Sequence, residues 1–239
     1  MYDLLMDLMF PQQACSLCQS PGLFWSRKPW CTACDQEIRD LGSSKSYCSV
    51  CGKFLCNGGN FCADCRENVP PFFVARAVGP YEGKIKKAIK LLKFVGQRQL
   101  ARRMGELMAG VVKSEPKYQG IDLLIPVPIT NNSLEQRGFN QAELLAVRIA
   151  HLLKKPVRSD ILIRIRETPS QRELTRELRE ENLKDAFCLK STRNIEGKKL
   201  LLVDDVYTTG STTRECTKVL LAGGAREVAV ITWAAGKGY

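Results

Sequence analysis

Two adjacent aspartates interrupt the stretch KKLLLVDDVYTTGST at residues 198–212 of this 239-residue chain. The four apolar residues before them predict a strand that is covered on both faces. Asp204 and Asp205 would then lie at its carboxyl end, where open α/β sheets bind their ligands. The short hydroxyl side chains and the glycine that follow favour a loop whose backbone N–H groups point at an anion. The stretch therefore predicts a phosphate site beside a carboxylate pair, with the loop formed by Thr208, Thr209, Gly210, Ser211 and Thr212.

The cysteines predict a second kind of chemistry. Nine of the 11 lie within residues 15–65, and eight of these form four Cys-x-x-Cys pairs. Thiolates at this spacing face one metal ion, and two pairs complete a closed, structural zinc site with four cysteine ligands. We expect two zinc ions rather than disulfides, because disulfides are rare in cytosolic proteins. The spacing allows either sequential pairing, in which the first Cys-x-x-Cys pair joins the second and the third joins the fourth, or cross-braced pairing, in which the first joins the third and the second joins the fourth. The predicted ligands are Cys15, Cys18, Cys31, Cys34, Cys48, Cys51, Cys62 and Cys65.

Aromatic residues are interleaved with these cysteines, and Cys56 is left over as a spare thiol. Such aromatic side chains either stack on single-stranded bases or form the small core of a zinc ribbon. Residues 1–70 carry six basic and seven acidic side chains, and this near-neutral balance favours the core. The aromatic residues concerned are Phe24, Trp25, Trp30, Tyr47, Phe54 and Phe61.

The basic character of the chain belongs to its second part. The net charge is +11, and residues 71–239 carry 30 basic against 18 acidic side chains. Consecutive prolines at positions 70 and 71 indicate a boundary, so we expect a zinc-binding domain at 1–70 and a second domain at 71–239. The densest positive region, 81–120, suits either a polyanion or an ordinary solvated helix face. The candidates for nucleic-acid contact are Lys84, Lys86, Lys87, Lys90, Lys93 and Arg137.

The elements that must position these residues alternate between strands and helices. We expect strands near 121–126, 200–204 and 227–233, and helices near 97–112 and from Ser211 to the glycines at 223–224. This order predicts an α/β fold with a doubly wound parallel sheet. Pro126 and Pro128 restrict Val127 between them and favour a special turn beside the phosphate site.

The polar segment at 164–179 predicts either a mobile lid or two exposed helices. The single histidine, His151, ends an apolar helical stripe, so an acid–base site built on histidine is not expected. No apolar run reaches the roughly 18 residues of a membrane helix, and the first residues lack the features of a secretory signal. We therefore expect a cytoplasmic protein, peripheral to the machinery that it serves.

These residues resemble the ComF family of competence proteins. LLLVDDVYTTGST resembles the phosphoribosyl diphosphate (PRPP) signature of type I phosphoribosyltransferases, and the ComF family joins such a domain to an N-terminal zinc domain. The other matching stretches are the Cys-x-x-Cys pairs, YEGKIKKAIKLLKFVGQ, IPVP, RGFNQAELLA, and TPSQ with Asn182 and Phe187. Together they span nearly the whole chain.

The resemblance implies a double zinc ribbon ahead of a type I phosphoribosyltransferase-like sheet. It implies that Asp204 and Asp205 act as the catalytic residues and bind the ribose hydroxyls, directly or through magnesium. It also implies a loop at 208–212 on the 5′-phosphate, and an IPVP turn and a mobile segment on the diphosphate. The implied PRPP-binding residues are Val203, Asp204, Asp205, Val206, Tyr207, Thr208, Thr209, Gly210, Ser211, Thr212, Pro126 and Val127.

Two functions of different classes follow from the resemblance. In the first, the protein takes part in the uptake and processing of transforming single-stranded DNA, with PRPP as a ligand and the zinc domain as a docking surface. A helicase-like translocase of the uptake machinery is then the candidate partner. In the second, the protein is an active phosphoribosyltransferase whose acceptor the sequence does not identify. The zinc domain and the basic second part favour the first function and leave enzymatic activity open.

Overall fold

The structure is a computed structural model of the whole chain. It describes residues 14–22, 29–43, 46–56, 58–166, 183, 185–191 and 195–238. Within these residues, no helix combines the length and the hydropathy that crossing a bilayer requires.

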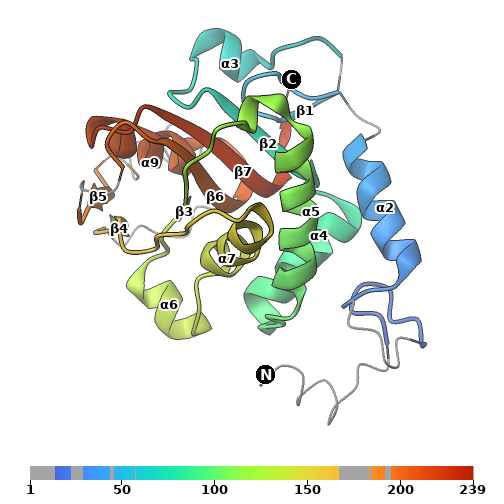
Figure 1. Cartoon of the computed structure of the whole chain (residues 1–239). Helices are drawn as coiled ribbons and strands as arrows, with labels where there is room; N and C mark the ends of the chain where they lie inside the picture. The colour runs from blue at the N-terminus through green and yellow to red at the C-terminus, as the bar shows by residue number, and fades with distance from the viewer. Residues whose placement is uncertain are drawn as a thin grey trace.

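A parallel sheet of four strands forms the centre of the molecule, in the order β2-β7-β6-β3 (Figure 1). The strands expected near 121–126, 200–204 and 227–233 are all present, although the middle one is longer than expected and includes both aspartates. Their bounds are β2 Val74–Pro80, β3 Leu123–Pro126, β6 Lys199–Tyr207 and β7 Glu227–Ala235.

Helices cover both faces of this sheet, because each central strand is a continuous apolar run whose successive side chains point to opposite faces. Leu201 and Val203 of β6 pack into a core with α2, α4, α5 and α7, whereas Leu200 and Leu202 pack into a second core with α9. Figure 1 shows α5 and α7 in front of the sheet and α9 behind it. The doubly wound α/β prediction is confirmed. The helices are α2 Thr32–Ser43, α4 Gly83–Lys90, α5 Leu100–Ser114, α6 Asn131–Arg137, α7 Gln141–Leu153 and α9 Ser211–Ala222.

Shorter elements complete the second domain. Leu91–Val95 form a π-helical segment, η1, which directly continues α4 and which the sequence pattern did not predict. The strands β4 (Leu162–Arg164) and β5 (Phe187–Leu189) pair with each other in antiparallel orientation, and η2 is a turn of 3-10 helix at Pro116–Tyr118. Most of the predicted lid at 164–179, with Thr168, Pro169 and Gln171, lies outside the described residues, as does Asn182.

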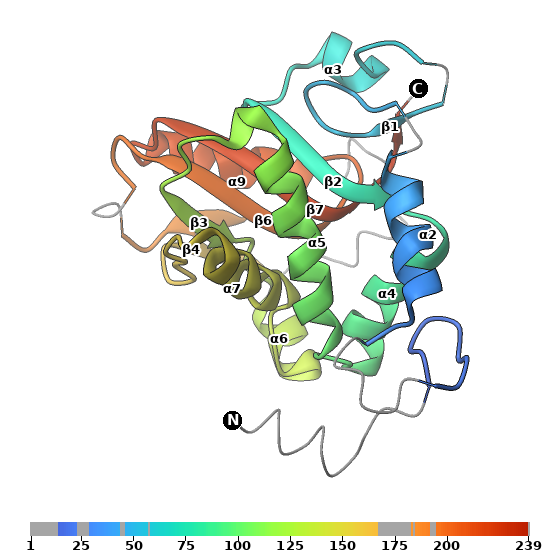
Figure 2. The ribbon, with the colours of Figure 1, turned by 45° about the vertical axis from the view of Figure 1, so that its right-hand side comes forward.

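The cysteine-rich part consists of two lobes that pack on different faces of the sheet. Lobe 1 contains Cys15–Cys34 and α2, and α2 packs against the carboxyl-terminal end of β2 (Figure 2). A Cβ atom on Gly42 of α2 would lie 2.1 Å from the carbonyl oxygen of Val78, so only glycine permits this close approach. Lobe 2 contains Cys48–Cys65, with β1 (Phe54–Leu55) and α3 (Ala63–Glu67), and its cysteines belong to the second core.

Lobe 2 is also joined to the end of the chain. β1 pairs in parallel with β8 (Lys237–Gly238), which follows the central strand β7. Both lobes therefore share their cores with the sheet, while a division into two domains at residue 70 remains a prediction.

Candidate functional site

The aspartate pair lies inside the carboxyl-terminal half of β6. Both side chains are almost fully buried, with 8% of Asp204 and 4% of Asp205 exposed. The backbone N–H of Asp205 donates to Asp204 Oδ1 at 2.8 Å, and the negative charge of Asp205 acts on the Asp204 carboxyl. Two neighbouring buried carboxyl groups do not both ionise at neutral pH unless a cation or ligand compensates their charge.

A cation from a distant part of the sequence compensates one of them. Lys93 Nζ forms an ion pair with Asp205 Oδ2, and Lys93 reaches it from η1. The π-helical segment ends at Gly96, whose left-handed backbone (φ +72°) turns the chain toward the next helix. Lys93, predicted as a nucleic-acid contact, is therefore placed at the acidic pair.

Burial and the negative charge of Asp205 together raise the pKa of Asp204 to about 8. At neutral pH Asp204 is then mostly protonated, while Asp205 is paired with Lys93. Burial lowers the pKa of Arg137, and the charge of Asp205 opposes this change, so the guanidinium stays charged close to the pair. One carboxylate facing two cations leaves a net positive site, which suits an anionic ligand.

The predicted phosphate loop follows β6 directly and leads into α9. Gly210 caps α9 with a left-handed backbone (φ +81°), and Thr213 Oγ1 donates to its carbonyl oxygen at 3.0 Å. Thr209 Oγ1 and Ser211 Oγ are hydrogen bonded at 2.8 Å, which orders the hydroxyl groups of the loop. Thr208 is exposed and Thr212 is half-buried, so the loop and the first turn of α9 present both backbone N–H groups and hydroxyls.

The IPVP turn lies beside β6, next to the residue that precedes the acidic pair. The backbone N–H of Val127 donates to Val203 O at 2.9 Å, and Asn140 Nδ2 donates to Val127 O at 3.0 Å. Asn140 also caps α7 through its Oδ1, so one side chain connects the turn to a helix N-terminus. Val127, Val203 and Tyr207 are buried, so their side chains are not exposed to a ligand.

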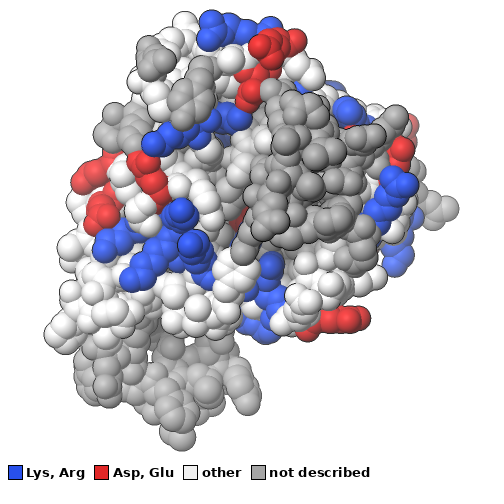
Figure 3. Space-filling view, turned by 180° about the vertical axis from the view of Figure 1, so that it is seen from behind, with Lys and Arg blue, Asp and Glu red and all other residues white. Residues whose placement is uncertain are grey.

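The four lysines of α4 that were predicted to contact nucleic acid differ in exposure and in their contacts. Lys86 is exposed and lies 5.5 Å from the ring centroid of Tyr81, and Lys90 is exposed. Lys87 Nζ donates to Leu17 O at 2.5 Å and so ties α4 to lobe 1. Lys84 is half-buried. Figure 3 shows Lys and Arg side chains gathered on the face opposite to that of Figure 1.

The two cysteine clusters have the geometry of tetrahedral zinc sites. The Sγ–Sγ distances are 3.8 Å for Cys15–Cys34 and 3.7 Å for Cys18–Cys31. A tetrahedral ion with Zn–S bonds of about 2.3 Å requires about 3.8 Å between its sulfur ligands. In lobe 2, Cys51 and Cys62 lie 3.6 Å apart in a cluster with Cys48 and Cys65.

These clusters decide between the two pairings that the spacing allowed. The first and second Cys-x-x-Cys pairs form one cluster and the third and fourth form the other, so the pairing is sequential. Backbone N–H groups of Leu17, Cys18 and Cys31 lie 3.3–3.4 Å from Cys15 Sγ, as expected for a thiolate ligand. Cys56 is exposed and lies outside both clusters.

Two of the aromatic residues between the cysteines lie in the cores. Trp30 is fully buried, its ring centroid lies 6.3 Å from that of Trp233, and its Nε1 donates to Asp35. Phe54 is buried as well. Tyr47 and Phe61 are about half-exposed, whereas Phe24 and Trp25 lie outside the described residues.

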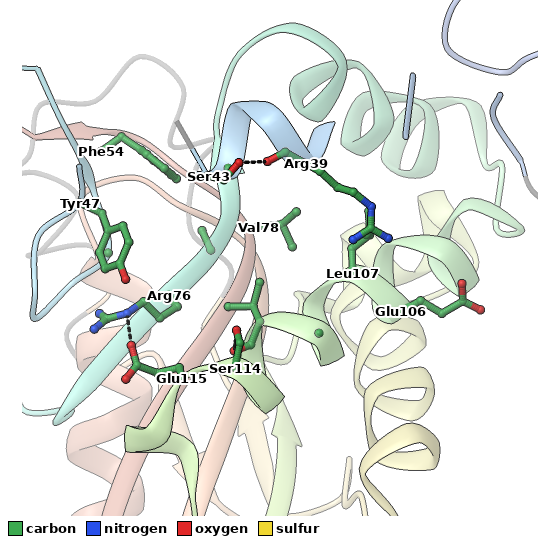
Figure 4. A pocket seen from close by; sticks show the side chains of 15 residues that line it. Arg39, Ser43, Tyr47, Phe54, Arg76, Val78, Glu106, Leu107, Ser114 and Glu115 are labelled. Carbon is green, nitrogen blue, oxygen red and sulfur yellow. Dashed lines mark hydrogen bonds and ion pairs between the residues drawn. The ribbon is translucent and has the colours of Figure 1, made fainter. Parts of the chain in front are cut away.

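A cavity of about 590 Å³ lies between α2, β2 and α5, away from the acidic pair (Figure 4). The charged side chains that line it are already paired within the protein. Arg76 Nε binds Glu115 at 2.7 Å, and Glu106 binds Arg103 and Arg148. Neither Asp204, Asp205 nor the phosphate loop lines this cavity.

Comparisons with known proteins agree with this architecture. A phosphoribosyl transferase domain model matches residues 137–239, and a double zinc ribbon model matches residues 5–72. The chain is 32% identical to the DNA utilization protein YhgH of Salmonella typhimurium, over 90% of this chain and 94% of that protein. It is 31% identical to competence protein F of Haemophilus influenzae, over 84% and 87% respectively.

Among solved structures, a phosphoribosylpyrophosphate amidotransferase from B. subtilis is 20% identical, with a TM-score of 0.40. That likeness covers 60% of this chain and 30% of the other. The coverage of the two curated relatives confirms the resemblance that the sequence indicated. The chain belongs to the family of competence protein F and DNA utilization protein YhgH, in which a double zinc ribbon precedes a phosphoribosyltransferase-type domain.

Proposed function

We propose that this protein takes part in the uptake and processing of transforming single-stranded DNA, and that its acidic pair and phosphate loop bind PRPP with magnesium. Its relatives are named for competence and DNA utilization. The observation that carries the ligand proposal is the buried Asp204–Asp205 pair, which directly precedes a hydroxyl-rich loop and faces Lys93 and Arg137.

Each part of PRPP has a matching group in this site. The carboxyl groups of Asp204 and Asp205 would bind the ribose hydroxyls, because a protonated carboxyl donates and a carboxylate accepts. Residues 208–212 would hold the 5′-phosphate. The backbone of the IPVP turn, with Lys93 and Arg137, would face the diphosphate.

Magnesium fits this donor set, since it prefers phosphate oxygens together with one or two carboxylates. Asp204 and Asp205 would hold it, and when bound it would neutralise charge on the diphosphate. Because Lys93 already pairs with Asp205, ligand binding would exchange that contact for one with the metal or the sugar. Lys93 would then be free to bind the leaving diphosphate.

Calorimetric titration with PRPP and magnesium tests the ligand proposal. We expect binding by the natural protein and a loss of at least tenfold in affinity in Asp205→Asn, because that variant removes the carboxylate. Asp40→Asn is the matched control, since Asp40 is exposed on α2, away from the site. Equal affinities in all three proteins would refute the proposal.

Transfer of phosphoribose to an acceptor is a second candidate function, favoured by the intact acidic pair. Loss of diphosphate from C1 of the ribose needs electrostatic stabilisation of the leaving group more than a strong base. Release of diphosphate from PRPP in a cell extract, abolished by Asp205→Asn, would establish transferase activity. No release, with PRPP binding intact, would favour a binding role alone.

The exposed lysines of α4 are the candidate contacts for single-stranded DNA. Lys87 is not changed in the test, because its contact with Leu17 O supports lobe 1. We expect Lys86→Glu with Lys90→Glu to weaken binding to an oligonucleotide and to lower its salt dependence. Lys113→Glu with Lys218→Glu, two exposed positions on α5 and α9, changes the net charge equally and serves as the control. An equal effect of both double variants would assign the binding to overall charge.

Cytoplasmic placement at the uptake machinery is part of the same proposal. The zinc lobes would serve as the docking surface for a helicase-like translocase, because lobe 2 leaves Phe61 half-exposed. Capture of a purified translocase by the natural protein, reduced by Phe61→Ser, would support that partner.

A further inference from the structure

Lobe 2 contacts the first turn of α9 through a buried arginine. Arg214 is 7% exposed, and its Nη2 donates to Asn68 O at 2.7 Å while its Nη1 lies 3.5 Å from Asn68 Oδ1. Asn68 follows α3, three positions after the zinc ligand Cys65. The backbone N–H of Arg214 donates to Gly210 O at 2.8 Å. Arg214 thus connects the segment that follows the last zinc ligand of lobe 2 to Gly210 of the phosphate loop.

A second connection reaches the other end of the loop. The N–H of Phe54 in β1 donates to Gly236 O at 3.1 Å, and the N–H of Gly236 donates to Tyr207 O at 2.8 Å. The ring of Tyr207 packs edge-on against Phe72, with 6.1 Å between centroids. Its hydroxyl fills the space beside Gly210, where a Cβ atom would lie 2.2 Å from it.

We propose that lobe 2 is a positioning device for the phosphate loop, with Arg214 and Tyr207 as positioning residues. The loop Thr208–Gly210 lies between these two contacts. At its start, Tyr207 accepts from Gly236, which also binds Phe54 of lobe 2. At its end, Arg214 binds Gly210 and also Asn68, which follows α3 of lobe 2. A zinc knuckle folds only when its thiolates gather on the metal, so the metal in lobe 2 supports the loop geometry. This inference rests on the proposed function, because it concerns the same phosphate site.

Lobe 1 provides the contrast that makes the inference testable. Its main polar contact is between Asp35 and Arg103 of α5, with Arg103 Nη2 2.7 Å from Asp35 Oδ2. Although Asp35 is buried, the donors Arg103, Trp30 and Arg39 hold its pKa below the ordinary value. These contacts lie on the face of the sheet opposite to α9 and involve no residue of the phosphate loop.

The experiment compares Arg214→Met, Phe72→Leu and the control Arg103→Met in the full-length, zinc-loaded protein. The probe is ribose 5-phosphate, titrated by calorimetry at a temperature where thermal unfolding shows all four proteins folded. We expect binding to weaken about tenfold in Arg214→Met and several-fold in Phe72→Leu. Phe72→Leu changes no charge, so its effect must arise from geometry. Arg103→Met should lower the unfolding temperature and leave the affinity unchanged.

Amide hydrogen exchange at residues 208–213 supplies a readout that needs no ligand. It should become faster in Arg214→Met and Phe72→Leu and stay unchanged in Arg103→Met. Natural affinity and natural exchange in both Arg214→Met and Phe72→Leu would overturn the inference, as would equal losses in the control Arg103→Met. If the natural protein binds neither ribose 5-phosphate nor PRPP, the proposed function fails, while the exchange comparison still decides whether lobe 2 orders the loop.

Discussion

Replacing Asp204 with asparagine should stabilise the protein at neutral and alkaline pH. Burial and Asp205 raise the pKa of Asp204 to about 8, whereas an aspartate in an unfolded chain titrates near 3.9. A folded-state pKa above the unfolded value means that the folded protein binds the proton more tightly. The stability contributed by this proton is therefore complete below about pH 4 and is lost as the pH rises to about 8.

The size of the effect follows from this difference. Each pKa unit corresponds to about 1.4 kcal/mol. Because this group stays protonated in the folded protein but ionises in the unfolded chain, it lowers the stability by roughly 2–4 kcal/mol at pH 7, allowing for relaxation around a buried pair. Asparagine keeps the acceptor oxygen for the N–H of Asp205 and carries no proton to lose. We expect Asp204→Asn to gain that amount at pH 7 and almost nothing at pH 4.

Urea unfolding at pH 4, 5, 6, 7 and 8 measures this difference directly. The free energy of unfolding of the natural protein should fall, relative to that of Asp204→Asn, across this range. Asp40→Asn should follow the natural protein, because Asp40 is exposed. Parallel pH profiles for the natural protein and Asp204→Asn would refute the reasoning, since they would mean that Asp204 is ionised in the folded state at no cost. The gain in stability should accompany a loss of PRPP binding, the usual relation at a site that is built for function.

Three further predictions concern the same framework. Lys93→Met should cost about 3 kcal/mol in urea unfolding at pH 7, because it leaves Asp205 buried without its cation; an unchanged midpoint would contradict the ion pair. Gly210→Ala should lower the unfolding temperature and abolish binding of ribose 5-phosphate, since φ is +81° and Tyr207 occupies the space for a Cβ atom; natural binding by this variant would contradict the loop geometry. A strong chelator should release two zinc ions per chain, measured with a colorimetric indicator, and should alter the near-ultraviolet circular dichroism as Trp30 loses its packing; release of one ion or none would contradict the two four-cysteine sites.

Local patterns made much of this structure predictable. The four Cys-x-x-Cys pairs indicated two metal sites because ligand spacing is a short-range property, and LLLV indicated a buried strand for the same reason. The start of α9 at Ser211 agrees with the expected helix, since glycine and hydroxyl residues before it mark a helix N-terminus. Which Cys-x-x-Cys pairs share a metal ion could be read only from the structure, because sequential and cross-braced arrangements have the same spacing.

The contacts that give the site its electrostatics were not predictable in this way. Lys93 and Asp205 are separated by more than 100 positions, and their ion pair depends on a π-helical segment that has no distinct pattern in LLKFV. Lys87 stood among exposed lysines in the sequence, yet it binds a backbone carbonyl of lobe 1. The link from Arg214 to Asn68 likewise follows from how lobe 2 packs on α9, which is a tertiary property.

Hydrogen exchange with and without PRPP and magnesium both detects the ligand and locates the residues that bind it. If PRPP binds at the acidic pair, the amides at residues 208–213 and in the IPVP turn should exchange more slowly when the ligand is present. Unchanged exchange at both places, or protection confined to the residues around the cavity between α2, β2 and α5, would contradict binding at this site.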